Sequence, residues 1–212
     1  MNRINPLRNL LVVTTAFVLT FSSLPAFAAE ESEAPTRQPD VMYVPTHPAV
    51  VEKMLEMAEV KKGDVVYDLG CGDGRIVVTA AKKYGVRAFG FDINPVRVKE
   101  SLENVRSNKV EHLVTIKQAD IFTLDLTEAS VVTLYLLPEL NVRLMPQLKK
   151  LKPGSRIVSH DFDMRGAKPV AVQKVRTKDS ESLEEDEHTV FKWIVPWEKD
   201  PTVSPDPPAP ER

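Results

Sequence analysis

The topology of this 212-residue chain can be read from the stretch Val65-Val-Tyr-Asp-Leu-Gly-Cys-Gly-Asp-Gly-Arg75. An apolar run leads directly into Gly70, Gly72 and Gly74, and a segment compatible with a helix follows. Glycines at these positions let the backbone turn sharply and approach a ligand that any Cβ would obstruct. A second apolar run ends at Asp92, about 20 residues after the loop, where a ribose-binding carboxylate is expected in a nucleotide-binding βαβ unit. The pattern therefore predicts a site for a ribose-bearing ligand.

The charges around these glycines narrow the identity of the ligand. A dinucleotide site usually has the spacing G-x-G-x-x-G and binds a pyrophosphate at a helix N-terminus. Here the spacing is G-x-G-x-G, and the flanking carboxylates of Asp68 and Asp73 would repel a pyrophosphate. They favour S-adenosylmethionine (SAM), which carries an ammonium and a sulfonium group beside a ribose that Asp92 could bind. A nicotinamide dinucleotide and a tight turn without any ligand are the alternatives.

The same residues resemble the motifs of the class I SAM-dependent methyltransferases. Asp68-Leu-Gly-Cys-Gly-Asp-Gly74 is similar to the first motif, Phe91-Asp92 to the second, and Gln118-Ala-Asp120-Ile-Phe122 to the third. In the third motif the acidic residue approaches the adenine amino group, so the resemblance implies that role for Asp120. The cofactor-binding residues that we predict follow these motifs: Asp68, Gly70, Cys71, Gly72, Gly74, Asp92, Ile93, Asp120 and Ile121.

A finer resemblance comes from a motif that precedes the glycine loop. Tyr43-Val-Pro-Thr46 and the glycine loop together look like the methyltransferase branch that contains the lysine methyltransferase of the ATP synthase c-subunit. The whole resemblance covers residues 39–196. It implies that a protein side chain, with lysine as the first choice, accepts the methyl group.

The order of periodic segments predicts an α/β fold. Apolar residues at helical spacing predict four helices: Val50–Ala58, Ile76–Tyr84, Pro95–Ser107 and Asn141–Leu151. Apolar or alternating runs predict seven strands: Asp64–Leu69, Arg87–Asp92, Val114–Gln118, Val131–Leu137, Ser155–His160, Val170–Arg176 and His188–Val195. Such alternation predicts a Rossmann-like, mostly parallel sheet with helices on both faces. The methyltransferase resemblance implies that the seventh strand is antiparallel, and the acidic segment Glu181–Glu187 is expected to be a hairpin loop.

The carboxyl ends of the predicted strands supply candidates for catalysis. Methyl transfer to an amine needs a free lone pair, so the site must desolvate the ammonium or accept its proton. His160 and Asp161 follow the fifth strand and could form a base with its orienting carboxylate, and Glu139 could orient an amine. A polar strand end and a first-turn helix acid are the structural alternatives for these residues.

Four further residues are predicted to contact the substrate or cover the cofactor. They are Tyr43, Thr46, Leu137 and Pro138. Many amino-group methyltransferases carry Asn/Asp-Pro-Pro-Tyr after the fourth strand, whereas this chain has Tyr135-Leu-Leu-Pro138-Glu139. That departure leaves the acceptor group open. A packed entry to the first helix is the alternative for Tyr43 and Thr46.

The N-terminus predicts an exported protein. Residues 1–28 hold Arg3 and Arg8, an apolar run over Leu10–Leu24, and the cleavage pattern Ala26-Phe-Ala28. The run is shorter than the about 20 residues that a membrane-spanning helix needs. We expect a cleaved signal peptide and a periplasmic or extracellular location, with an uncleaved membrane anchor as the alternative.

The remaining chain is expected to form one domain at residues 39–197, between a polar linker at 29–38 and a disordered tail at 198–212 that holds five prolines. Loss of residues 1–28 would leave 26 of the 28 basic residues against 30 acidic ones, which argues against a nucleic-acid partner.

Cys71 is the single cysteine, so no internal disulfide can form. The four histidines show no paired ligand spacing along the chain, so no structural metal is expected. No pattern predicts an oligomeric state.

These observations favour an exported SAM-dependent methyltransferase that acts on a protein side chain. One alternative is a non-catalytic binding module of the cell envelope, because nothing in the sequence explains how SAM would reach an exported enzyme. The other alternative is a small-molecule methyltransferase. The intact acids Asp68, Asp92 and Asp120 argue against a decayed cofactor site.

Overall fold

The computed structural model describes residues 38–178 and 185–202. The expected signal peptide, nearly all of the expected linker and most of the proline-rich tail lie outside these residues, so the domain boundaries stay a prediction. Within the described residues, no helix combines the length and apolar character needed to cross a membrane.

The described residues form a single mixed sheet with helices. The α-helices are α1 (Pro48–Met57), α2 (Arg75–Tyr84), α3 (Pro95–Ser107) and α4 (Pro138–Leu148), and a 3-10 helix, η1, covers Ile121–Thr123. The strands are β1 (Val65–Leu69), β2 (Arg87–Asp92), β3 (Val114–Gln118), β4 (Val131–Leu134), β5 (Arg156–His160), β6 (Ala171–Lys178) and β7 (Glu185–Ile194). Their order in the sheet is β3-β2-β1-β4-β5-β7-β6.

The direction of the strands confirms the expected seven-stranded, mostly parallel sheet. Strands β1 to β5 pair in parallel, whereas β7 is antiparallel to both β5 and β6. Every residue of the central strand β1 is buried. Burial on both sides explains why its sequence is a nearly continuous apolar run rather than an alternating one.

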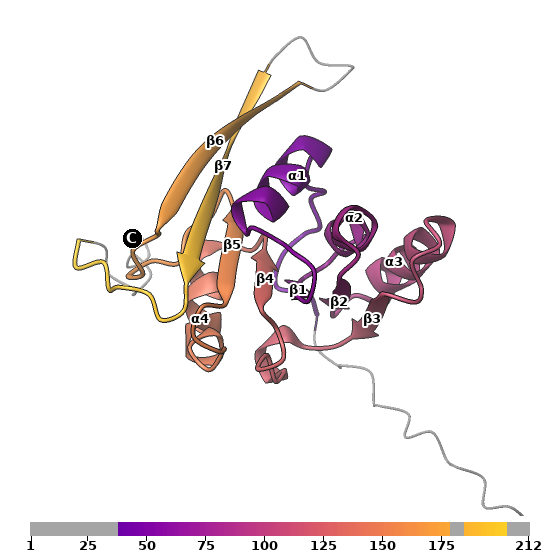
Figure 1. The fold of residues 1–212 in the computed structure, drawn as a ribbon, viewed down its shortest axis with the longest axis horizontal. Helices are drawn as coiled ribbons and strands as arrows, with labels where there is room; N and C mark the ends of the chain where they lie inside the picture. Colours follow the sequence, from indigo (N-terminus) through magenta and orange to yellow (C-terminus); the bar gives the residue numbers. More distant parts are fainter. Residues whose placement is uncertain (1–37, 179–184, 203–212) are drawn as a thin grey trace, which may run out of the picture. The chain divides into compact units, whose positions relative to one another are not determined.

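Helices cover both faces of the sheet, as predicted. Helices α1, α2 and α3 lie on one face, and α4 and η1 lie on the other (Figure 1). The first face buries a core that includes Met54 and Val77, and the second buries Leu144, Leu148 and Trp193. Each fully buried side chain of this size contributes about 1.5–3 kcal/mol to folding.

Local sequence signals place the helices that flank the glycine loop. Asn94 caps α3, because its side chain accepts the backbone N–H of Val96 at 2.9 Å, and Pro95 starts the helix. Gly85 ends α2 with a φ of 63°, and its N–H donates to the carbonyl of Ala81 at 3.0 Å. Both caps were predicted from the sequence.

The structure corrects the region after β4. The predicted strand Val131–Leu137 ends at Leu134, and the helix predicted at Asn141–Leu151 runs from Pro138 to Leu148. Pro138 has no N–H to leave unsatisfied, so it fits the first turn of a helix. The apolar residues between β4 and α4 leave the sheet and line a cavity instead of extending the strand.

Two more differences concern elements that the sequence did not indicate. The 3-10 helix η1 begins after Asp120, whose side chain accepts the N–H of Phe122. The acidic segment expected to be a loop contributes its last residues to β7, where Glu187 pairs with Arg176 of β6. Opposite charges on paired strands explain why acidic residues are accommodated in this hairpin.

Candidate functional site

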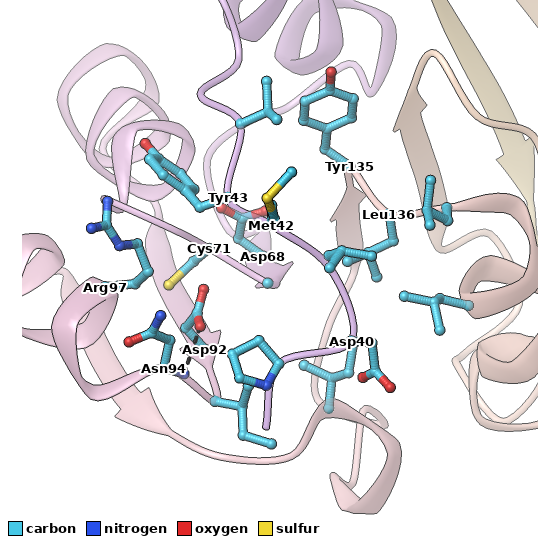
Figure 2. Close-up of a pocket in the computed structure, with 18 of the residues that line it drawn as sticks. Asp40, Met42, Tyr43, Asp68, Cys71, Asp92, Asn94, Arg97, Tyr135 and Leu136 are labelled. Atoms are coloured by element: carbon cyan, nitrogen blue, oxygen red, sulfur yellow. Dashed lines mark hydrogen bonds between the residues drawn. The ribbon is translucent and has the colours of Figure 1, made fainter. Parts of the chain in front are cut away.

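A cavity of about 260 Å³ lies beyond the carboxyl ends of β1, β2 and β4. Figure 2 shows Asp68, Cys71 and Asp92 on one side of it and Tyr135 and Leu136 on another. The segment 39–46, which we call the strap, also lines the cavity. In open α/β sheets, ligands bind at this edge, so the cavity has the position expected of a cofactor site.

Asp92 is held in a fixed orientation by backbone donors. Its Oδ2 accepts the N–H of Gly72 at 2.9 Å, and its Oδ1 accepts the N–H of Asn94 at 2.8 Å. Burial raises the pKa of this carboxyl, although these hydrogen bonds oppose the effect. The loop is tied to the same strand, because Gly70 and Cys71 both donate to the carbonyl of Phe91. The carboxylate is therefore oriented before any ligand binds.

Asp68 has a buried oxygen without a partner. The residue is only 3% exposed, and Thr133 Oγ1 donates to its Oδ1 at 2.6 Å. Its Oδ2 is buried and has no hydrogen-bond partner among the described residues. Burial, together with the nearby charges of Asp92 and Asp73, raises the pKa of Asp68 to about 7, although the hydrogen bond from Thr133 opposes the effect. An unpaired buried carboxylate is costly, so the cavity suits a ligand with a cationic group.

The strap is fastened over the glycine loop by several contacts. A Cβ on Gly72, whose φ is 56°, would lie 2.2 Å from Cε2 of Tyr43, so only glycine lets this ring approach the loop. The guanidinium of Arg97 lies 4.6 Å from the centre of the same ring. Arg75 donates to the carbonyl of Thr46 at 2.7 Å and forms an ion pair with Asp73 at 2.6 Å.

Most predicted cofactor and lid residues come together at the cavity. Those that line it are Tyr43, Thr46, Asp68, Gly70, Cys71, Asp92, Ile93, Asp120, Ile121 and Leu137. Gly72, Gly74 and Pro138 are not among the lining residues. Gly72 supports the strap, and a Cβ on Gly74 would lie 3.1 Å from the side chain of Ser101 in α3. Their roles toward the cofactor stay predictions.

Cys71 has a second contact besides the cavity. Its thiol is buried and lies 3.7 Å from Ser101 Oγ, and burial raises the pKa of the thiol. A neutral, buried thiol is a poor nucleophile. The geometry therefore agrees with a small packing side chain at this position.

The predicted catalytic residues do not line the cavity. Glu139 is exposed in the first turn of α4, while His160 and Asp161 lie behind the cavity wall. The His160 ring is 3.9 Å from the Tyr135 ring, and its Nδ1 is 3.3 Å from Thr46 Oγ1. Burial lowers the pKa of His160 to about 4, against the opposing influence of Asp161. Catalysis by these three residues stays a prediction.

Strand pairing adds a third residue to the predicted His160–Asp161 pair. His188 Nδ1 lies 3.0 Å from His160 Nε2 and 3.0 Å from Asp161 Oδ2. The two histidines are far apart in the chain, so their spacing does not indicate a shared site. The antiparallel pairing of β5 and β7 brings them together across the sheet.

Several cavity residues were not predicted from the sequence. They include Asn94, Arg97, Tyr135, Leu136, Leu140 and Phe162, together with the first residues of the strap. The N-cap pattern at Asn94 explains why this residue lies beside Asp92. Tyr135 stood in the stretch that replaces Asn/Asp-Pro-Pro-Tyr, but the strand was expected to continue through it.

The fold and the cavity define a SAM-dependent methyltransferase. The sequence model of the ANTKMT methyltransferase domain matches residues 68–171. The chain is 46% identical over 159 residues to a protein-lysine N-methyltransferase of Saccharolobus islandicus, covering 74% of this chain and 95% of that protein. It is 30% identical over 157 residues to the lysine N-methyltransferase of the ATP synthase c-subunit from Xenopus laevis, covering 72% and 67%. The chain therefore belongs to the methyltransferase family that contains these proteins.

A solved structure supports the same assignment. The crystal structure described as an RNA methyltransferase from Salinibacter ruber, in complex with S-adenosylhomocysteine, is 46% identical and has a TM-score of 0.64. The match covers 72% of this chain and 94% of that chain. SAM is accordingly the cofactor of this enzyme, and the unpartnered oxygen of Asp68 fits the cationic part of SAM.

Proposed function

We propose that this enzyme transfers the methyl group of SAM to the side-chain amine of a lysine in a protein substrate. The observation that carries the proposal is the 46% identity to a protein-lysine N-methyltransferase across 95% of that protein's length. The name of the Xenopus laevis relative also specifies a lysine in a protein, the c-subunit of the ATP synthase.

The cavity offers residues for each part of the cofactor. SAM supplies a methyl group that is activated by its attachment to a sulfonium. We assign Asp68 to the ammonium group, because its buried Oδ2 needs a cationic or donating partner. Asp92, which backbone N–H groups already orient, is assigned to the ribose hydroxyls. Asp120 is assigned to the adenine amino group from the motif resemblance, and it lines the same cavity.

Aromatic and aliphatic residues form the wall on the acceptor side. Tyr135 and Phe162 stack with their ring centres 6.1 Å apart, and both line the cavity with Leu137 and Leu140. An apolar wall disfavours the charged ammonium and so promotes the neutral amine that can attack a methyl group. Positioning of the neutral amine can supply much of the rate enhancement.

The Salinibacter ruber structure raises RNA as a competing acceptor, because its description names an RNA methyltransferase. The composition of this chain argues against RNA, since 28 basic residues face 30 acidic ones. Binding to a phosphate backbone usually needs a basic surface. We therefore favour a protein over RNA as the methyl acceptor.

We further propose that the enzyme acts outside the cytoplasm. The support is the charge, apolar run and cleavage pattern of residues 1–28. N-terminal sequencing of the protein from fractionated cells tests this proposal. A start at Ala29 in the envelope or medium is expected, whereas a start at Met1 in the cytosol would refute export.

Methyl transfer from labelled SAM to envelope proteins and to total RNA tests the acceptor. We expect label on protein, released as methylated lysine after acid hydrolysis, and none on RNA. Label on RNA alone would overturn the proposal.

The variant Asp92→Ala tests the cofactor assignment. It should weaken S-adenosylhomocysteine binding at least tenfold in calorimetry, because the ribose hydroxyls lose their acceptor. The control Asp186→Ala changes an exposed acid of β7 outside the cavity and should leave binding unchanged. Equal affinities for both variants would contradict the assignment of Asp92.

A further inference from the structure

Three potential metal-binding atoms meet between β5 and β7. His160 Nε2, Asp161 Oδ2 and His188 Nδ1 form a nearly equilateral triangle, with sides of 3.2 Å, 3.0 Å and 3.0 Å. None of the three residues lines the cofactor cavity. The triangle is therefore a separate feature of the molecule, and its chemistry needs its own explanation.

The backbone fixes Asp161 so that one oxygen faces both imidazoles. Asp161 has a left-handed φ of 58°, which is unusual for a residue with a side chain. Its N–H donates to the carbonyl of Thr189 at 2.7 Å, and its Oδ1 accepts the N–H of Thr189 at 2.7 Å. These two bonds leave Oδ2 directed at His160 and His188.

Hydrogen bonds alone do not satisfy this triangle. Each imidazole nitrogen has one direction in the ring plane, occupied either by a hydrogen or by a lone pair, so each makes one hydrogen bond there. If both nitrogens donate to Asp161 Oδ2, two N–H groups face each other across 3.0 Å. If one nitrogen donates to the other, the contact of at least one of them with Asp161 has no hydrogen available. A cation between the three atoms would instead accept all three lone pairs.

The contact of His160 with Thr46 fits such a cation. Thr46 Oγ1 lies 3.3 Å from His160 Nδ1 and can accept its hydrogen, which leaves the Nε2 lone pair free to bind an ion. Metal-binding histidines usually donate their second ring nitrogen to a partner in this way. The side chains of His188 and Asp161 are 21% and 28% exposed, so an ion and its water ligands can reach the triangle.

We propose that His160, Asp161 and His188 bind a first-row transition-metal dication, such as Zn²⁺ or Fe²⁺. Two imidazoles favour these ions over Mg²⁺ and Ca²⁺, which prefer oxygen ligands. At metal–ligand distances of about 2.1 Å, neighbouring ligands of an octahedral ion lie about 3.0 Å apart, and those of a tetrahedral ion about 3.4 Å apart. The observed sides agree with one face of an octahedron, which leaves three positions for water.

The bound ion would fix the wall of the methyltransferase cavity from behind. It would join the end of β5 to β7, and His160 contacts both Tyr135 and Thr46. In this arrangement the Nε2 lone pair of His160 binds the metal, so His160 positions the cavity wall and does not act as a general base.

Metal binding by the purified full-length protein tests the proposal, and the protein must be prepared without a polyhistidine tag. The protein is stripped with a chelator and titrated with Co²⁺, whose visible absorption bands report imidazole ligands, and with Zn²⁺ in calorimetry. We expect one ion per chain. His188→Ala and Asp161→Asn should each weaken binding at least a hundredfold, and Asp161→Asn keeps the oxygen that accepts from Thr189.

His112→Ala is the matched control, because His112 is exposed and lies outside the cluster. It should bind the metal as the wild type does, and circular dichroism should show all variants folded. The proposal would be overturned if the wild type bound the metal no more tightly than His188→Ala does. It would also be overturned if His112→Ala lost as much metal affinity as His188→Ala. Both readouts are independent of methyl transfer, so they stand whatever the acceptor is.

Discussion

The substitution Asp68→Asn should stabilise the ligand-free enzyme at pH 8 while removing its affinity for the cofactor. The folded state raises the pKa of Asp68 to about 7 from an ordinary value of 3.8, because the carboxyl is buried. A raised pKa means that the folded state binds the proton more tightly than the unfolded state does. The contribution of Asp68 to stability is therefore complete below its unfolded pKa of 3.8, and it is lost progressively as the pH rises to the folded value of about 7.

The size of the effect follows from the two pKa values. Relative to a permanently neutral side chain, the ionisable Asp68 costs the folded state about 4 kcal/mol at pH 8 and about 2 kcal/mol at pH 5. Asparagine replaces the unpartnered Oδ2 by an NH₂ group, which costs about 1–3 kcal/mol at either pH. The stability difference between variant and wild type should thus change by about 2–3 kcal/mol over this range.

Urea unfolding of both proteins at pH 5 and pH 8, after removal of bound SAM, measures this difference. Subtracting the two pH values cancels the constant cost of the amide and the titration of every group that does not interact with Asp68. Added S-adenosylhomocysteine should raise the unfolding midpoint of the wild type and leave that of Asp68→Asn almost unchanged. The reasoning would be refuted if the free energy of unfolding of the asparagine variant differed from that of the wild type by the same amount at pH 5 and at pH 8.

Two further substitutions test the loop and the core. Gly72→Ala places a Cβ 2.2 Å from the ring of Tyr43, so the affinity for S-adenosylhomocysteine should fall at least tenfold in calorimetry. The control Gly63→Ala also changes a glycine at positive φ, but its Cβ would have nothing within 4 Å, so this variant should keep the wild-type affinity. Arg156→Met removes the 2.5 Å ion pair to the buried Asp64 and should cost about 3 kcal/mol in urea unfolding. Arg87→Met, which removes an exposed pair, should cost less than about 1 kcal/mol, and equal losses would contradict this reasoning.

The parts of the fold that follow from local chemistry were predictable from the sequence. The glycine loop, the Asn94 cap and the Gly85 stop each depend on residues adjacent in the chain, and the structure has them where the sequence placed them. The course of the segment Tyr135–Leu137 could not be predicted in this way. An apolar run has the same composition whether it extends a strand or lines a cavity, so its course depended on where α4 begins.

The site was predictable to the extent that it lies at strand ends. Asp68 and Asp92 lie at the carboxyl-terminal parts of the parallel strands β1 and β2, and parallel strands bring their carboxyl ends to one edge. The cluster around His188 depends instead on the register of β7 against β5, which a sequence pattern does not determine. The contact of Tyr43 with Gly72 likewise joins segments that have no shared local signal.

The position of β7 constrains the order in which this domain is built. It is the last described strand in chain order, yet it lies inside the sheet between β5 and β6 (Figure 1). Until β7 has left the ribosome, β5 presents an open, apolar strand edge that can pair with other chains. We therefore expect the sheet to be completed only once β7 is available, and a chain interrupted before residue 185 should aggregate rather than form a smaller stable domain.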